Sequence, residues 1–311
     1  MTQRRLDLYD PADLIRKLIG EFTDLKAIKK YYDQVSGLVP CAKKSVPTVK
    51  QAYSLYTPKR QDVDLVEILG ACLDEHKLPF KWRYQKRGTC VGQAGAMCSD
   101  LVMAVAWLVL DKVYPGRTAV ATCYTGSRVE VAGQVGSWDG SNGSWMSEFL
   151  VEWGIATLKE LGLGEEELDE DERLAVRWTA TRAGIPDKFE LIAKERPIVK
   201  SPQVTDVEEA IACLESGNPI IECSNLYGQD QDTDNVVGIY SQRGGHAQTL
   251  AGIRWPKSGD PEFKLTNSWS DTWGRKGSVW ISAASAQKML NQDDSYAFVG
   301  VQGLEPGKIS L

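Results

Sequence analysis

The sequence predicts an α+β fold with two lobes, one mainly helical and one mainly built from strands. The stretch from Cys90 to about Lys112, CVGQAGAMCSDLVMAVAWLVLDK, is apolar nearly all round, which is typical of a helix buried inside a domain. After residue 200 the pattern changes to short strand-like runs separated by turn residues. The chain has 311 residues, 42% of them hydrophobic, which is enough to bury sizeable cores.

Residues 1–78 are predicted to form a basic N-terminal extension. The first 60 residues hold twelve Lys/Arg and six Asp/Glu, a net charge of +6; the whole chain carries −6, which leaves −12 for residues 61–311. This charge is either ordinary solvated surface or a means of docking on the chain's own body or a neighbouring acidic surface. Asp10 is a predicted N-cap for an amphipathic helix with one apolar stripe of Leu14, Leu18, Phe22 and Leu25.

The rest of the extension is predicted to be irregular, with one short helix around residues 63–74, because prolines interrupt it at positions 40, 47, 58 and 79. Residues 79–311 form the predicted body, mainly helical over 79–200 and mainly β over 201–311. A second helix of the helical lobe is indicated by SWMSEFLVEWG, in which Gly154 ends a run of apolar residues at helical spacing, namely Met146, Phe149, Leu150 and Trp153.

The second half opens with a predicted capping box, Thr205 and Glu208, before a helix whose buried face holds Val207, Ile211 and Leu214. The predicted strands that follow are PIIECS (219–224), AQTLAGIRW (247–255), EFKLTNS (262–268) and GSVWIS (277–282). The acidic run EEELDEDER (165–173) is interpreted as a solvated helix face or loop without a function.

Seven cysteines, an odd number without a CxxC pair, argue against a disulfide framework and for buried thiols. Cys72 and His76 stand four apart, as two metal ligands on a helix would, but no second pair lies nearby, so no metal or other cofactor is predicted. The N-terminus lacks a signal-peptide pattern, and no apolar run reaches the length of a membrane span. We therefore expect a cytoplasmic or particle-associated protein, with no membrane or nucleic-acid partner.

Three short blocks contain residues suited to nucleophilic catalysis: GTCVGQA around Cys90, GGHAQTLAGI around His246, and LTNSWSDTWGRKGSVWIS around Asn267. The chain has two histidines, and His76 lies in a polar, helical pattern. His246, at the predicted start of a strand and after two glycines, is therefore the candidate partner of a Cys90 nucleophile.

In this order, the three blocks resemble the active-site blocks of the papain-like cysteine peptidases, over roughly residues 80–300. The third block is the most specific. The resemblance implies a papain-like two-lobed fold in which the helical lobe carries the cysteine helix and the β-rich lobe carries the histidine, with a cleft between them.

The resemblance also implies a role for each residue. Cys90 would attack as a thiolate at a helix N-terminus, and His246 would act as its acid and base. Asn267 would orient the imidazole, and Trp269 would shield that hydrogen bond from water. The backbone N–H of Cys90 and the side chain of Gln85 would bind the oxyanion.

The sequence departs from the family pattern in three places. Gln85 stands five positions before Cys90 instead of six, with Tyr84 at the sixth, which we interpret as a one-residue deletion. Val91 replaces the usual aromatic residue after the nucleophile. No cysteine stands near Arg87 to form the family's disulfides, as expected in a reducing compartment.

A substrate contact is also implied. The segment WDGSNGSWMSEF resembles the one that pairs with an extended peptide, which makes Gly143 a candidate substrate-binding residue. The alternative is an ordinary turn before a helix.

The function expected from these residues is a cysteine endopeptidase, a hydrolase that cleaves polypeptide substrates through a Cys-His-Asn site and an acyl-enzyme. Two alternatives remain open. The same chemistry would serve acyl transfer to an amine, as in a transglutaminase. A papain-like scaffold could also be a non-enzymatic assembly protein, for example of a virus-like particle, with the N-terminal arm making the assembly contacts.

Overall fold

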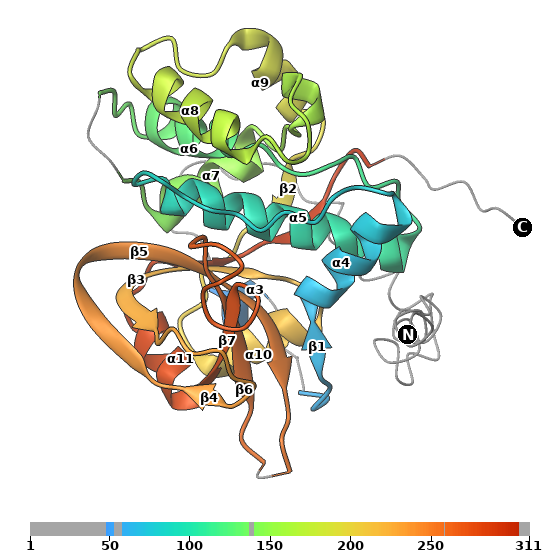
Figure 1. Cartoon of the computed structure of the whole chain (residues 1–311), viewed down its shortest axis with the longest axis vertical. Coiled ribbons are helices and arrows are strands. Elements are labelled where there is room, and N and C mark those ends of the chain that lie inside the picture. Colours follow the sequence, from blue (N-terminus) through green and yellow to red (C-terminus); the bar gives the residue numbers. More distant parts are fainter. Residues whose placement is uncertain (1–47, 53–57, 137–139, 258, 305–311) are drawn as a thin grey trace, which may run out of the picture.

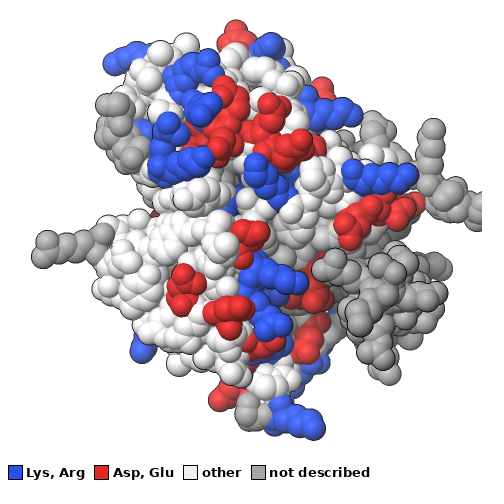
Figure 2. Space-filling view, viewed as in Figure 1, with Lys and Arg blue, Asp and Glu red and all other residues white. Residues whose placement is uncertain are grey.

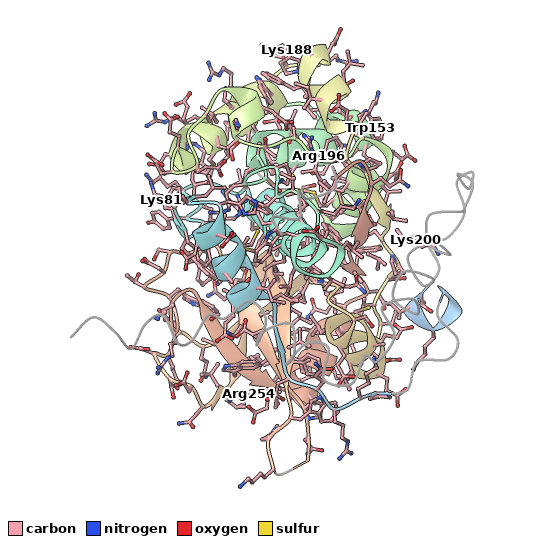
Figure 3. All side chains as sticks on the ribbon, turned by 90° about the vertical axis from the view of Figure 1, so that its right-hand side faces the viewer. Lys81, Trp153, Lys188, Arg196, Lys200 and Arg254 are labelled. Carbon is pink, nitrogen blue, oxygen red and sulfur yellow. The ribbon has the colours of Figure 1, made fainter. Side chains whose placement is uncertain are left out.

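The computed structural model describes residues 48–52, 58–136, 140–257 and 259–304, and it confirms the predicted α+β class. The amphipathic helix predicted after Asp10 lies outside the described residues. Figure 1 shows the helices α6 to α9 gathered in one lobe and the sheet in the other, with the long helix α5 along the boundary. Figure 3, turned by 90°, shows Lys188 and Arg196 in the helical lobe and Arg254 in the β lobe.

Helix α5 (Cys90–Leu110) is the central element of the core. All of its residues from Cys90 to Ala106 are buried. Its length and composition alone would let it cross a membrane, but 78% of its most apolar window is buried within the fold. It packs against helices α4 and α6 and against strand β5. The prediction of a buried helix from Cys90 is confirmed.

Two glycines explain how neighbouring helices approach α5 so closely. A Cβ at Gly92 would lie 2.6 Å from the Cβ of Tyr124 on α6 (Val120–Thr125). A Cβ at Gly95 would lie 2.6 Å from the sulfur of Met146 on α7 (Gly143–Glu152). Each glycine weakens an isolated helix by about 1 kcal/mol, and here the cost is offset by the packing it permits.

The other elements of the helical lobe follow α6 along the chain. A π-helical segment (Gly126–Val131) continues directly from α6. The remaining elements are a 3-10 turn (Lys159–Leu161), helix α8 (Leu168–Thr179) and helix α9 (Asp187–Ala193). Figure 2 shows acidic and basic side chains interspersed over one face of this lobe.

A buried ion cluster joins the segment before α5 to the middle of that helix. Asp100 of α5 accepts hydrogen bonds from Arg83 Nη2 at 2.6 Å and Arg117 Nε at 2.8 Å, and from the backbone N–H of Thr118 at 2.6 Å. Although burial alone would raise the pKa of Asp100, the guanidinium charges of Arg83 and Arg117 lower it. Outside this cluster, the exposed side chain of Lys81, labelled in Figure 3, donates a hydrogen bond to the carbonyl of Glu166.

The β lobe is built on a seven-stranded sheet of described residues with the order β4-β7-β6-β5-β3-β8, and β1 pairs with the far end of β5. The described pairings are antiparallel except that of β4 with β7. The strands are β1 Val63–Asp64, β3 Ile220–Gly228, β4 Val236–Val237, β5 Ile239–Arg254, β6 Glu262–Thr266, β7 Ser278–Ser282 and β8 Ser295–Ala297. Strands β2 (Ile198–Lys200) and β9 (Val299–Val301) form a separate pair.

The four predicted strands are confirmed as β3, β5, β6 and β7, but β5 is longer than predicted. It begins at Ile239, so His246 lies within the strand and not at its start. The two glycines before His246 did not end the strand, because β3 continues to pair alongside as far as Gly228.

The predicted capping box is displaced by one residue. The N-cap of α10 (Val207–Glu215) is Asp206, whose carboxylate accepts from the N–H of Glu209. The carboxylate of Glu209, not Glu208, reaches back to Thr205 and accepts from its N–H and its hydroxyl at 2.7 and 2.9 Å. Asp is as good an N-cap as Ser or Thr, so the motif moves one position along the chain.

Residues 58–78 of the predicted extension are packed into the body. Strand β1 pairs with β5, and helix α4 (Leu65–Glu75), which confirms the helix predicted around residues 63–74, packs against α5 (Figure 1). Its buried residues are Leu65, Ile68, Leu69, Cys72 and Leu73. The domain boundary at residue 78 stays a prediction.

The pair Cys72 and His76 ends helix α4. The ring Nδ1 of His76 lies 2.8 Å from the carbonyl oxygen of Cys72 and 3.9 Å from its sulfur. Among the described residues, no group of three or more His, Cys, Asp or Glu is placed to hold a metal ion. The His76 side chain thus contacts a carbonyl of the last turn that already accepts from the His76 backbone N–H at 3.1 Å.

Two glutamates of α10 anchor the N-terminal segment. Glu209 accepts from the N–H of Lys50, next to Val49 in helix α3 (Val49–Ala52), at 2.8 Å. Glu215, 6% exposed, accepts from the N–H groups of Lys59 and Gln61 and from the indole of Trp255.

We expect Glu215→Ala to lower the free energy of unfolding by about 2–4 kcal/mol, because three partly buried donors lose their acceptor. Trypsin cleavage after Lys59 and Arg60 should become faster. The control is Glu208→Ala on the same helix, which removes an exposed ion pair with Lys50 and should change stability much less. Urea unfolding tests both; equal effects of the two variants would contradict the anchoring role of Glu215.

A second prediction concerns Glu222, which is fully buried on β3 opposite Gln248. Burial raises its pKa from 4.5 to about 8, so the folded protein keeps the carboxyl proton after the unfolded chain has released it. The stability contributed by this group is therefore complete below about pH 4.5 and is lost as pH rises through about 8.

Glu222→Gln does not titrate and should flatten this loss, which amounts to a few kcal/mol at about 1.4 kcal/mol per pKa unit. The measurement is the free energy of unfolding at a series of pH values, with exposed Glu208→Gln as the control. An unchanged pH dependence in Glu222→Gln would mean that the carboxyl is already ionised in the fold.

Candidate active site

Cys90 is the first residue of α5, the helix that runs along the boundary between the lobes in Figure 1. Cys90 is 9% exposed. The helix begins here because Thr89 accepts the first intrahelical bond, from Gln93 N–H at 2.9 Å. The positive end of the helix dipole favours an anion at this position, and thus the thiolate form of a cysteine.

His246 and Asn267 come from neighbouring strands. His246 lies on β5, and Asn267 directly follows β6, which pairs with β5. The ring Nε2 lies 2.8 Å from the side-chain oxygen of Asn267, which also accepts from the N–H of Ser268. An amide oxygen accepts only, so Nε2 carries the proton and Nδ1 is left for the thiol. Burial lowers the pKa of His246, and the bond to Asn267 opposes this shift.

Two aromatic rings, which also stack on each other, pack against the imidazole. Trp269 stacks on His246 with ring centroids 4.8 Å apart, as the shielding role requires. Tyr227 of β3 also stacks on His246, at 5.1 Å and nearly parallel, and no sequence pattern had singled it out. Burial raises the pKa of Tyr227, and a negative charge on Cys90 would raise it further. The histidine, the asparagine and the two aromatic rings are thus joined in the β lobe, and the approach of Cys90 to them stays a prediction.

Gln85 is bound to this group by its backbone and its side chain, whereas the Tyr84 side chain is largely exposed. Its N–H donates to the carbonyl of Ser268 at 2.8 Å, and its side-chain oxygen accepts from the Ser268 hydroxyl at 2.6 Å. Its side-chain amide donates to the carbonyl of Arg87 at 3.0 Å. Tyr84 is 49% exposed and forms a bridge with Trp269. An NH₂ group has two hydrogens, so the Gln85 amide has one donor beyond the bond to Arg87.

The structure does not support the predicted peptide-binding role of Gly143. Gly143 is the first residue of α7, and its N–H donates to Asp294 at 2.8 Å, while the N–H of Ser144 donates to the other oxygen at 3.0 Å. A Cβ at position 143 would lie 2.6 Å from the Asp294 carbonyl oxygen. The N–H of Gly143 is thus engaged within the fold, as in an ordinary turn before a helix, and a contact of this segment with a peptide stays a prediction.

The interpretation of the acidic run 165–173 as solvated is wrong for two of its members. Asp171 and Glu172 of α8 are buried. Asp171 accepts from the N–H groups of Val120 and Ala121 at the start of α6, and burial raises its pKa to about 6. Glu172 contacts the loop before Cys90. The spacing of the residues could have predicted this burial, because Asp171 and Glu172 share one helix face with the buried residues Leu168, Ala175 and Thr179.

No family model and no curated protein sequence matches the chain. Solved structures do match. Xylellain, a cysteine protease from Xylella fastidiosa, is 19% identical with a TM-score of 0.54, covering 86% of this chain and 96% of its own. Procathepsin B S9 from Trypanosoma congolense is 13% identical with a TM-score of 0.50, covering 86% and 84%.

The proform of Amb a 11, a cysteine protease and ragweed pollen allergen, is 14% identical with a TM-score of 0.51, covering 88% of this chain and 74% of its own. These identities are low, so the likeness concerns the backbone. The chain has the fold of the papain-like cysteine proteases.

Proposed function

We propose that the protein is a cysteine endopeptidase that hydrolyses polypeptides through Cys90, His246 and Asn267. The observation that carries the proposal is the hydrogen bond of His246 to Asn267, stacked under Trp269, in the lobe that faces the N-terminus of the Cys90 helix. This arrangement fixes the tautomer and the plane of an imidazole, which is what a thiol needs from its base.

The proposed reaction assigns each of these residues one task. The Cys90 thiolate attacks the peptide carbonyl, and His246 donates its Nδ1 proton to the leaving amine. Water then attacks the acyl-enzyme while the same nitrogen accepts a proton from it. The backbone N–H of Cys90 and the remaining amide hydrogen of Gln85 stabilise the oxyanion in both steps. Asn267 holds the ring without gaining or losing a proton.

Selective chemistry at Cys90 is expected because the other described thiols are kept neutral. Burial raises the pKa of each of them, namely Cys72, Cys98, Cys123, Cys213 and Cys223. A neutral, buried thiol is a poor nucleophile.

A third prediction is therefore that an epoxide inhibitor of active-site thiols modifies Cys90 rapidly near neutral pH, and that His246→Ala abolishes the rapid phase. Peptide mass spectrometry locates the label, and Cys90→Ser is the negative control. Slow labelling spread over several cysteines, unaffected by His246→Ala, would overturn the peptidase proposal.

A further prediction concerns Asn267→Ala. The bond to Asn267 raises the pKa of His246, so its loss should lower that pKa and move the alkaline limb of the pH profile to lower pH, since the imidazolium is the proton donor. We also expect kcat/KM to fall by about tenfold or more. The matched control is Asn235→Ala, an exposed asparagine of the same lobe. An unshifted alkaline limb would contradict the orienting role.

A further inference from the structure

The loop that leads into the nucleophile is held by one buried carboxylate. Glu172 of α8 is 1% exposed. Its Oε1 accepts from the N–H groups of Lys86 and Arg87 at 3.0 and 3.1 Å and from the hydroxyl of Thr89 at 2.6 Å. Its Oε2 lies 3.1 Å from the Lys86 N–H and 3.5 Å from the guanidinium of Arg87. A buried carboxylate needs such donors, and here one short loop supplies all four.

This loop connects the two donors proposed for the oxyanion. Gln85 lies immediately before it and Cys90 immediately after it. The carbonyl of Arg87 accepts from the Gln85 side-chain amide at 3.0 Å and from the Thr89 N–H at 2.7 Å. Fixing the backbone around Arg87 therefore also fixes where the Gln85 amide lies.

Helix α8 is a rigid support for this contact. Asp171, next to Glu172, binds the N–H groups of Val120 and Ala121 at the start of α6, and α6 packs against both α5 and α8. The same support thus fixes the helix that carries Cys90 and the residue that holds the loop before it. An exposed ion pair between Lys86 and Asp169 adds little to this.

From these contacts we propose that Glu172 is a positioning residue, which holds the Gln85 amide and the Cys90 N–H at the spacing that binds the oxyanion. The inference rests on the proposed peptidase function. Glu172 touches neither the substrate nor the thiol. Its loss should therefore weaken stabilisation of the tetrahedral oxyanion and leave the reactivity of the thiolate in place.

The test compares two reactions of Cys90 in the full chain. Hydrolysis of a peptide amide passes through an oxyanion, whereas alkylation by iodoacetamide displaces iodide from carbon and forms none. We expect Glu172→Gln to lower kcat/KM for hydrolysis by about a hundredfold, as for loss of an oxyanion donor. The alkylation rate constant of Cys90 across pH should stay within a factor of about three, by the same reasoning.

Two further variants sharpen the comparison. Thr89→Val removes one donor to the same carboxylate and should give a smaller loss in the same direction, which keeps the proposal testable if Glu172→Gln does not fold. Glu170→Gln, on the same helix, loses only exposed pairs with Arg173 and Arg177 and should change neither reaction.

The outcomes separate the two proposals. Wild type that hydrolyses peptides, with Glu172→Gln unaffected or with hydrolysis and alkylation reduced equally, overturns the positioning role alone. Wild type that hydrolyses no peptide overturns the proposed function, and the role of Glu172 with it. A selective loss of hydrolysis supports both.

Discussion

The fold depends on enclosing α5, a helix that is apolar on all sides from its first residue. Such a helix is stable only when other elements surround it, so the helical lobe and the sheet must both pack against it. The glycines at 92 and 95 let α6 and α7 come close enough to do so. Since both lobes meet on this helix, its N-terminus lies where side chains from the two can converge. The position of Cys90 is thus a consequence of core packing as much as of chemistry.

Buried carboxylates that bind backbone N–H groups recur throughout the structure. Asp100, Asp171, Glu172, Glu209 and Glu215 all accept from backbone N–H groups of segments outside their own helix or turn. Irregular segments have unpaired N–H groups, and an acidic side chain from a nearby helix can satisfy several of them at once. In this chain, the carboxylates of aspartates and glutamates fix irregular segments to the fold, as strand pairing or a disulfide can do in other proteins. The same device fixes the N-terminal segment, the start of α6 and the loop before the nucleophile.

Periodic hydrophobicity was enough to predict α5, α7 and the central strands, because burial of an apolar face decides those elements. The three sequence blocks supplied the candidate site residues Cys90, His246 and Asn267, whose catalytic roles stay a prediction. What could not be predicted depends on distant partners. Glu172 stands in an acidic run, so its sequence neighbours do not distinguish it. Its role becomes visible only from its contacts with the loop before Cys90. Tyr227 matters because β3 lies beside β5, and Gly143 is engaged because Asp294 lies opposite it. The length of β5 likewise followed from its partner strand and not from its own turn residues.

The pairing of β1 with β5 also constrains how the chain reaches its fold. Val63 pairs with Ile253, a separation of 190 positions, and Lys59 contacts Glu215 across 156. Contacts this distant carry a high loop-closure entropy and slow folding. During synthesis, the apolar face of α4 cannot be fully buried until β5 has left the ribosome, because β5 is one of the elements that cover it. The early part of the nascent chain is therefore dependent on the late part, and the protein is a poor candidate for stepwise, N-terminus-first folding.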